Sequence, residues 1–428
     1  MIDTQPARER AYLIGVQLPG TSHEVLTEQM RELEELTRTA GGDVVLSDVQ
    51  RREEVEPAFF VGRGKVAEIR ERRQELRYDL VICNEDLSPR QQRNLEKELS
   101  IRVVDRTELI LDIFAQHART HEGRIQVEAA QLRHLLPRLI GAYDYHRQMG
   151  GIGTRGGPGE QQIEVERRRI RRRLRLLDEE LAQVRSQRGQ QRIGRRRAEL
   201  TTVAIVGYTN AGKSTLINAL TGAGVRAGDS LFVTLDPTTR RLRLPSAREV
   251  LLTDTVGFIQ KLPTDLIAAF RATLEEVTFA DVILEVVDAA APAALEQATT
   301  VDEILGELGA ADKPRVVAIN KVDLLGPATV RRVMRCFAER YRSQVPISAL
   351  RGAGLDALGD AIDAATADRF VALEVLIPYG REEMLHELRQ HGDLQRVEYT
   401  DRGTYAQGRA PSELAHRFRD YATSIPPP

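Results

Sequence analysis

The stretch GYTNAGKS, residues 207–214, decides the fold of this 428-residue chain. It follows the β-branched apolar run TTVAIV (201–206) and precedes the apolar run TLINAL (215–220), which has the character of a helix. Strand, G-x-x-x-x-G-K-S loop and helix in this order are typical of a loop whose backbone N–H groups surround phosphates. We therefore expect a P-loop domain with a mainly parallel sheet and helices on both faces.

The side chains of this loop have distinct expected roles. Lys213 should reach the β- and γ-phosphates, and Ser214 should bind Mg²⁺. Asn210 could help to hold a monovalent cation such as K⁺ beside the same phosphates. Alone, such a motif occurs by chance and in many NTPases, but the flanking strand and helix favour nucleotide binding. The residues of the loop expected to bind the nucleotide are Gly207, Tyr208, Thr209, Asn210, Ala211, Gly212, Lys213, Ser214 and Thr215.

Two downstream segments are expected to contact the γ-phosphate and the metal. The strand EVLLTD (249–254) carries Asp254 to the metal through a coordinated water, and Gly257 offers its N–H to the γ-phosphate. In SLFVTLDPTTR (230–240), Thr234 is our choice to complete the Mg²⁺ shell, with Thr238 or Thr239 as the alternatives. The expected nucleotide-binding residues here are Phe232, Val233, Thr234, Leu235, Asp236, Asp254, Thr255, Val256 and Gly257.

The residue after Gly257 raises a question about catalysis. In well-known GTP-hydrolysing switches a glutamine at this place orients the attacking water. Here it is Phe258, whose side chain cannot form a hydrogen bond with water. The chain is therefore either an inactive switch or an enzyme whose water is positioned by other groups. Lys213, the Gly257 N–H and the K⁺ that Asn210 could hold are the expected catalytic groups.

The motif NKVD (320–323) predicts which base is bound. It ends the buried strand VVAIN (316–320), and α/β folds bind ligands at the carboxyl ends of strands. Asp323 can accept hydrogen bonds from guanine N1–H and N2–H, and adenine lacks the second donor. This favours GTP over ATP. The residues expected around the base are Asn320, Lys321, Val322, Asp323, Ser348, Ala349 and Leu350.

The rest of the chain divides into three further parts. Strand-like and helical runs alternate up to about residue 120, which predicts a parallel or mixed sheet flanked by helices. After about residue 366, a strand, a helix and a hairpin turning at residues 401–403 predict a small α+β domain. The expected boundaries are 1–120 for the N-terminal α/β domain, 121–197 for a helical, arginine-rich subdomain with a glycine-rich loop, 198–366 for the GTPase domain and 367–428 for the C-terminal domain.

A long helix from residue 163 is expected to carry two different faces. One is an apolar stripe at heptad-like spacing, which predicts packing against a neighbouring helix in a hairpin or coiled coil. Residues 163–197 also contain 13 arginines and five acidic residues, so most guanidiniums lack a partner on the helix. Because arginine favours bidentate contact with phosphate, this excess predicts binding to nucleic acid, RNA above DNA. The stripe is Ile163, Ile170, Leu174, Leu177, Leu181 and Val184; the expected RNA-binding residues are Arg167, Arg168, Arg171, Arg172, Arg175, Arg195 and Arg196.

The composition narrows the function classes. With 61 basic and 63 acidic residues the chain is nearly neutral, so affinity for nucleic acid has to come from a local patch. Its two cysteines, Cys83 and Cys336, offer neither a disulfide framework nor a zinc site. We expect a cytoplasmic protein that is a monomer when free, with no segment that spans a membrane.

Taken together, these motifs resemble the HflX family of translation-factor-related GTPases, in the Obg-HflX superfamily. The resemblance extends over about residues 10–360 and includes segments upstream of the P-loop. After GPGE the family usually has Thr-Gln, where this chain has Gln161-Gln162. The matching segments are FFVGRGKVAEI (59–69), DRTELILDIFAQHARTHEGRIQVEAAQLRHLLPRL (105–139), GIGTRGGPGE (151–160), GYTNAGKST, LFVTLDPTTR, DTVGFIQKLP, NKVD and ISAL.

The resemblance implies a GTPase that binds the rRNA of the large ribosomal subunit and splits or rescues stalled ribosomes under stress. It also places Phe258 among GTPases with a hydrophobic residue here, whose side chain turns away from the nucleotide. Two alternatives stay open at this point. One is a GTP-dependent switch that recruits a protein partner without RNA, and the other is an RNA-remodelling GTPase in ribosome biogenesis.

Overall fold

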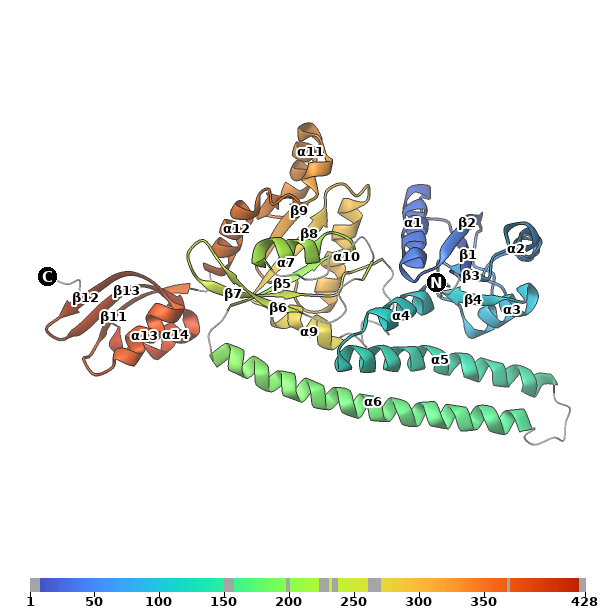
Figure 1. Ribbon diagram of the computed structural model, residues 1–428, viewed down its shortest axis with the longest axis horizontal. Helices are drawn as coiled ribbons and strands as arrows, with labels where there is room; N and C mark the ends of the chain where they lie inside the picture. The colour runs from blue at the N-terminus through green and yellow to red at the C-terminus, as the bar shows by residue number, and fades with distance from the viewer. Residues whose placement is uncertain are drawn as a thin grey trace, which may run out of the picture. The chain divides into compact units, whose positions relative to one another are not determined.

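The computed structural model shows separate α/β, helical and sheet elements along the chain (Figure 1). Contacts divide the chain into two compact units. One comprises residues 1–185, 228–236 and 256–274, and the other residues 186–227, 237–255 and 275–428. The structure describes residues 8–149, 158–197, 201–222, 231–232, 238–260, 271–367 and 370–422.

The N-terminal part forms a four-stranded, fully parallel sheet, as its alternating pattern predicts. The strand order is β2-β1-β3-β4, and helices connect consecutive strands. One of these helices begins with a capping box, in which the Ser88 Oγ accepts from the Gln91 N–H. The elements are β1 (Arg10–Gln17), α1 (His23–Thr39), β2 (Asp43–Arg51), α2 (Arg63–Leu76), β3 (Leu80–Cys83), α3 (Pro89–Leu99), β4 (Arg102–Asp105) and α4 (Arg106–His117).

Two long helices follow, α5 (His121–Met149) and α6 (Pro158–Arg197), and they lie side by side (Figure 1). Ile125 and Ala129 of α5 pack against Leu177 and Leu181 of α6. Leu174, Leu177 and Leu181 of the predicted apolar stripe therefore lie in a packing face. Ion pairs flank this seam, and the Arg173 guanidinium contacts Glu128 of α5 through two hydrogen bonds of 2.6 and 2.8 Å.

The second unit contains the six-stranded sheet of the GTPase domain, with strand order β10-β9-β8-β5-β7-β6. All neighbouring strands are parallel except β6 and β7, which confirms the predicted mainly parallel sheet. Its strands are β5 (Thr201–Gly207), β6 (Thr239–Arg243), β7 (Glu249–Asp254), β8 (Val282–Asp288), β9 (Arg315–Asn320) and β10 (Gln344–Pro346). Its helices are α7 (Lys213–Thr221), α9 (Arg271–Phe279), α10 (Ala294–Glu307), α11 (Pro327–Ala338) and α12 (Leu355–Ala367).

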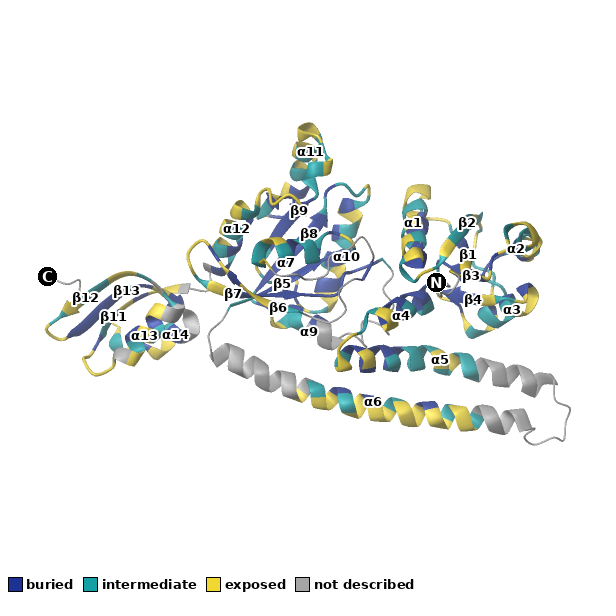
Figure 2. Ribbon diagram, viewed as in Figure 1, coloured by how far each residue is buried: buried dark blue, intermediate teal, exposed yellow. Residues whose placement is uncertain are grey.

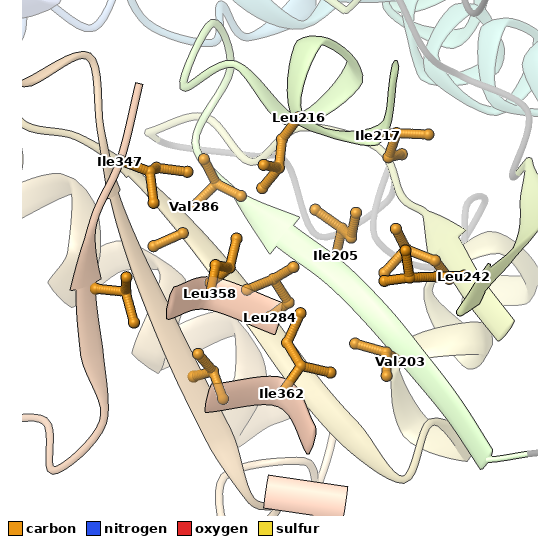
Figure 3. Packing of buried hydrophobic residues seen from close by; sticks show 14 of the residues in the cluster. Val203, Ile205, Leu216, Ile217, Leu242, Leu284, Val286, Ile347, Leu358 and Ile362 are labelled. Carbon is orange, nitrogen blue, oxygen red and sulfur yellow. The ribbon is translucent and has the colours of Figure 1, made fainter. Parts of the chain in front are cut away.

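Apolar side chains bury both faces of this sheet. On one face, α7 contributes Leu216 and α12 contributes Leu358 and Ile362 to a cluster with the central strands (Figure 3). On the other face, α10 and α11 pack on β8 and β9 through residues such as Ala298 and Phe337. The sheet is therefore the middle layer of three, and the carboxyl ends of its strands form one rigid edge for a ligand.

The C-terminal part is a three-stranded antiparallel sheet in the order β11-β13-β12, with its hairpin turn where the sequence predicts it. Two helices bury one of its faces through residues such as Leu388 and Leu414. Its elements are β11 (Phe370–Ile377), α13 (Glu382–His391), β12 (Asp393–Thr400), β13 (Gly403–Pro411) and α14 (Ser412–Arg417). No helix in the described ranges is long and apolar enough to cross a bilayer.

Candidate nucleotide-binding site

The P-loop leaves the carboxyl end of β5 and lies close against two other elements. A Cβ on Gly207, whose φ is +146°, would clash with the Val286 carbonyl oxygen of β8. A Cβ on Gly212, at φ +95°, would clash with the Asn320 amide nitrogen. Only glycine combines these backbone angles with this close approach, so the two motif glycines fix the path of the loop.

Lys213, the first residue of α7, lies across the loop from which it emerges. Its Nζ donates hydrogen bonds to the carbonyl oxygens of Gly207 at 3.1 Å and Tyr208 at 2.8 Å. Burial lowers the pKa of this ammonium to about 8, while the charge of Asp254 opposes that change. Bound phosphates would strengthen the charged form, which a buried lysine in a polar loop needs for phosphate binding.

Ser214 and Asp254 meet at the expected metal position. The Ser214 Oγ donates to Asp254 Oδ2 at 3.3 Å, and Asp254 is fully buried at the end of β7. The backbone N–H of Thr255 donates to Asp254 Oδ1 at 3.0 Å, while the Thr255 hydroxyl donates to the Ile205 carbonyl at 2.6 Å. Hydroxyl and carboxylate oxygens are the ligands that Mg²⁺ prefers, so this pair fits the metal.

Asn320 joins the P-loop to the segment expected to surround the base. Its Nδ2 donates to the Ala211 carbonyl at 2.8 Å, and its Oδ1 accepts from the Ala349 N–H at 2.9 Å. Beside it, Lys321 adopts a left-handed backbone angle of φ +61° and pairs with Asp288 at 2.7 Å. The structure thus brings the NKVD motif and residues 348–350 to the same strand edge as the P-loop.

Asp323 has a partner that the sequence did not indicate. The Arg351 Nε lies 3.4 Å from Asp323 Oδ2, and the Arg351 side chain is 69% exposed. Arg351 directly follows Ser348-Ala349-Leu350, but an arginine in a loop carries no pattern that marks it as a neighbour of the base. Leu350 itself is 81% exposed.

Parts of the two expected switches, residues 228–236 and 256–274, belong to the same compact unit as the N-terminal sheet, whereas Asp254 and Thr255 belong to the other unit. The Leu231 N–H donates to Thr39 Oγ1 at 3.2 Å. The Phe232 ring meets Phe114 of α4 edge-on, with 4.6 Å between the ring centroids. Phe258 is almost fully buried, at 1% exposure. The expected residues Val233, Thr234, Leu235 and Asp236 lie outside the described residues.

Arg106, at the start of α4, is the central polar residue of this arrangement. It is 2% exposed and donates to the Gln260 carbonyl at 3.3 Å and to Asn84 Oδ1 at 3.0 Å. Its guanidinium also pairs with Glu32 of α1. Sequence reasoning missed this cluster because Arg106 and Gln260 are 154 residues apart and no pattern in their segments marks them as neighbours.

The expected RNA-binding arginines of α6 differ in their surroundings. Arg171, Arg172 and Arg175 are exposed, and within the described residues none of the three has a hydrogen bond or ion pair. Arg167 is only 18% exposed and, like Arg168, pairs with Glu164. Arg195 and Arg196 lie within α6, but their side chains are not among those described.

Comparisons with known proteins place this geometry in one family. Three family models match consecutive parts of the chain: "GTP-binding GTPase N-terminal" at 27–115, "GTP-binding GTPase Middle Region" at 117–195 and "50S ribosome-binding GTPase" at 202–321. The GTPase HflX of Caldanaerobacter subterraneus is 42% identical over 418 residues, which is 97% of this chain and 94% of that protein.

The GTPase HflX of Escherichia coli is 44% identical over 363 residues, 85% of this chain and 84% of that protein. Among solved structures, a GTP-binding protein from the hyperthermophilic archaeon Sulfolobus solfataricus, in complex with GDP, is 26% identical with a TM-score of 0.44. The match covers 84% of this chain and 99% of that chain.

Proposed function

We propose that this chain, which belongs to the HflX family of GTPases, binds the large ribosomal subunit through rRNA and splits or rescues stalled ribosomes under stress. As a member of this family it binds GTP and hydrolyses it to GDP and phosphate. We name the ribosome as the partner because Arg171, Arg172 and Arg175 of α6 are exposed and have no hydrogen bond or ion pair within the described residues. A cytoplasmic location accompanies this partner.

The charge of α6 supports RNA as the partner. One side of the helix is held by α5 through Leu177 and Leu181, so the other sides are presented at fixed positions. Arg171, Arg172 and Arg175 are exposed there without partners in the described part of the chain. Unpaired guanidiniums on a rigid helix favour phosphate, and the helix carries no aromatic residue for base stacking. We therefore expect these arginines to contact the phosphate backbone of rRNA rather than its bases.

In hydrolysis, the groups of this chain position the γ-phosphate and stabilise its developing charge. Lys213 and the Gly257 N–H are the proposed donors to the transferring phosphoryl group. Ser214 and, through water, Asp254 would hold Mg²⁺, with Thr234 as a further proposed ligand. When bound, the metal would supply positive charge that offsets the negative charge developing on the phosphoryl group. K⁺ at Asn210 stays a prediction.

The contacts of α4 and α1 give hydrolysis a proposed route to the N-terminal domain. Residues 231–232 and Gln260 flank the segments expected to hold the γ-phosphate, and they contact Thr39, Phe114 and Arg106. Loss of the γ-phosphate releases such segments in switch GTPases. The environment of the N-terminal domain would therefore change with each cycle of hydrolysis. The affinity for the ribosome would change with it.

The salt dependence of ribosome binding, compared between the wild type and a variant at three α6 arginines, tests the proposal. Replacing Arg171, Arg172 and Arg175 by Gln should weaken binding of the GTP-analogue form to large ribosomal subunits. It should also make the plot of log affinity against log salt shallower by about 2 to 3, roughly one for each phosphate that the variant no longer neutralises. Affinity is measured by co-sedimentation at several salt concentrations.

The matched control is Glu179→Gln, which lies one helical turn after Arg175 and removes an exposed carboxylate from the same face. It should leave the affinity unchanged or raise it. Binding that ignores salt, or that the arginine variant leaves intact, would contradict the rRNA contact and favour a protein partner. Equal affinity in the GDP and GTP-analogue states would contradict a nucleotide-controlled factor.

A further inference from the structure

The helix α11 of the GTPase domain carries a second concentration of arginine. Residues 327–342, which contain α11 and the turn after it, include five arginines and a single acidic residue, Glu339. Figure 2 shows that α11 exposes most of its surface. Arg331, Arg332, Arg335 and Arg342 are all exposed. The sequence predicted RNA-binding arginines on α6 alone, so the arginines of α11 have no assigned role.

These four guanidiniums have no structural partner in the described residues. None of them has a hydrogen bond or ion pair there. The fifth, Arg340, differs because it pairs with Asp302 at 2.6 Å and donates to Thr299 at 2.8 Å. Arg340 therefore has a structural role within the domain, whereas the other four leave their charge to solvent or to a partner.

The inner side of α11 fixes the orientation of the arginine face. Phe337 is buried against β9 and α10, and Val333 and Met334 pack beside it. Arg331 and Arg335 are one turn apart, about 6 Å along the axis, and project from the same side of the helix. A row of guanidiniums is thus held on a packed element, so that ordering it on a partner costs little backbone entropy.

The composition of the face selects the kind of partner. Stable protein–protein interfaces contain a buried apolar or aromatic centre. No residue of α11 is among the large hydrophobic side chains exposed in the described part of the chain. A face that offers guanidinium groups without apolar anchors matches the phosphate backbone of folded RNA, to which arginine binds bidentately.

We propose that Arg331, Arg332 and Arg335 of α11, with Arg342, form a second RNA-binding surface that contacts the phosphate backbone of large-subunit rRNA. This surface belongs to the GTPase domain, whereas the surface on α6 belongs to the helical subdomain. The choice of ribosomal RNA rests on the proposed function. Contact through α11 would connect the element that follows the NKVD motif directly to the RNA.

Two variants of the full-length chain test this surface, one that reverses the charge and one that keeps it. The first replaces Arg331, Arg332 and Arg335 by Glu, and the second replaces the same three by Lys. Each is loaded with a GTP analogue, and its affinity is measured from roughly 50 to 200 mM salt. The probes are intact large ribosomal subunits and protein-free large-subunit rRNA. Guanine-nucleotide affinity serves as the folding control, because α11 directly follows the base-reading motif.

The Glu variant should bind both probes more weakly, with a salt slope shallower by about 2 to 3. The Lys variant should keep most of the slope, because it keeps the charge. Unchanged affinity and slope in the Glu variant would overturn the inference, as would weaker binding at an unchanged slope, which indicates a protein contact. If the wild type bound free rRNA but not intact subunits, and the Glu variant weakened that binding, the proposed ribosome partner would be wrong and the RNA-binding surface on α11 would be supported. If it bound neither probe, both would fail.

Discussion

At the scale of one residue, Asp323 is the side chain that we propose to select the base. Its carboxylate lies on a short turn, Val322–Leu324, that follows β9 directly. The motif predicted this position, since NKVD ends a buried strand. The neighbour Arg351 at 3.4 Å could not be predicted, because their proximity depends on how the loop after β10 folds back. Local pattern predicts a residue's own place, while its partners depend on the tertiary fold.

Replacing Asp323 by Asn should change the base that is bound. An amide can accept from N1–H and donate to a carbonyl at position 2, which xanthine has and guanine lacks. GTP affinity should fall roughly 10- to 100-fold, because a charge-assisted hydrogen bond is worth about 1.5 to 3 kcal/mol. Affinity for xanthosine triphosphate should rise, and fluorescence competition with labelled nucleotides measures both. The exposed Asp312→Asn is the control and should change neither. Retained selectivity for GTP would contradict the assignment of Asp323.

At the scale of elements, the strands beside the motifs could be predicted closely, whereas the long helix expected from residue 163 begins at Pro158. β7 coincides with the predicted EVLLTD, and α3 begins after the Ser88 cap as its sequence indicates. The order of the strands could not be predicted, because neighbours such as β5 and β8 are joined by contacts distant in sequence. The predicted glycine-rich loop at 149–160 falls mostly outside the described residues.

Glu285, in the middle of β8, is an exception to the apolar pattern of buried parallel strands. It is fully buried, and its partner is the Arg315 guanidinium of β9 at 3.2 Å. Burial raises the pKa of Glu285 to about 7, although Arg315 acts in the opposite direction. The folded chain therefore holds this proton more tightly than the unfolded chain. The resulting stabilisation is complete below about pH 4.5 and is lost as the pH rises through 7.

The variant Glu285→Gln should remove this pH dependence. The difference in free energy of unfolding, variant minus wild type, should be larger at pH 8 than at pH 5 by about 1 to 3 kcal/mol. Urea unfolding followed by circular dichroism at the two pH values measures the difference. Glu303→Gln, on the exposed side of α10, is the matched control and should leave the pH profile unchanged. Parallel profiles for wild type and Glu285→Gln would show that Arg315 keeps the carboxylate ionised throughout.

At the scale of the whole molecule, the compact unit to which Phe258 belongs gives a physical reading of this residue. Phe258 belongs with the N-terminal sheet in one compact unit and is buried. Two residues further on, the Gln260 carbonyl accepts from Arg106. A buried aromatic side chain at this place fits a structural role rather than contact with water, and we propose that another group orients the nucleophile. The motifs predicted a GTPase. The contacts of α4 with Phe232 and Gln260 could be found only from the fold.

We propose that GTP hydrolysis by this chain is slow until the large ribosomal subunit binds. Measuring GTP turnover with and without isolated large subunits checks this proposal. Phe258→Leu keeps the buried apolar volume and serves as the test variant, while Lys213→Ala gives the background. We predict slow turnover alone and an increase of at least about tenfold with subunits, since a transition-state group supplied in trans is worth far more. Phe258→Leu should keep that increase. Turnover that subunits leave unchanged would contradict the claim.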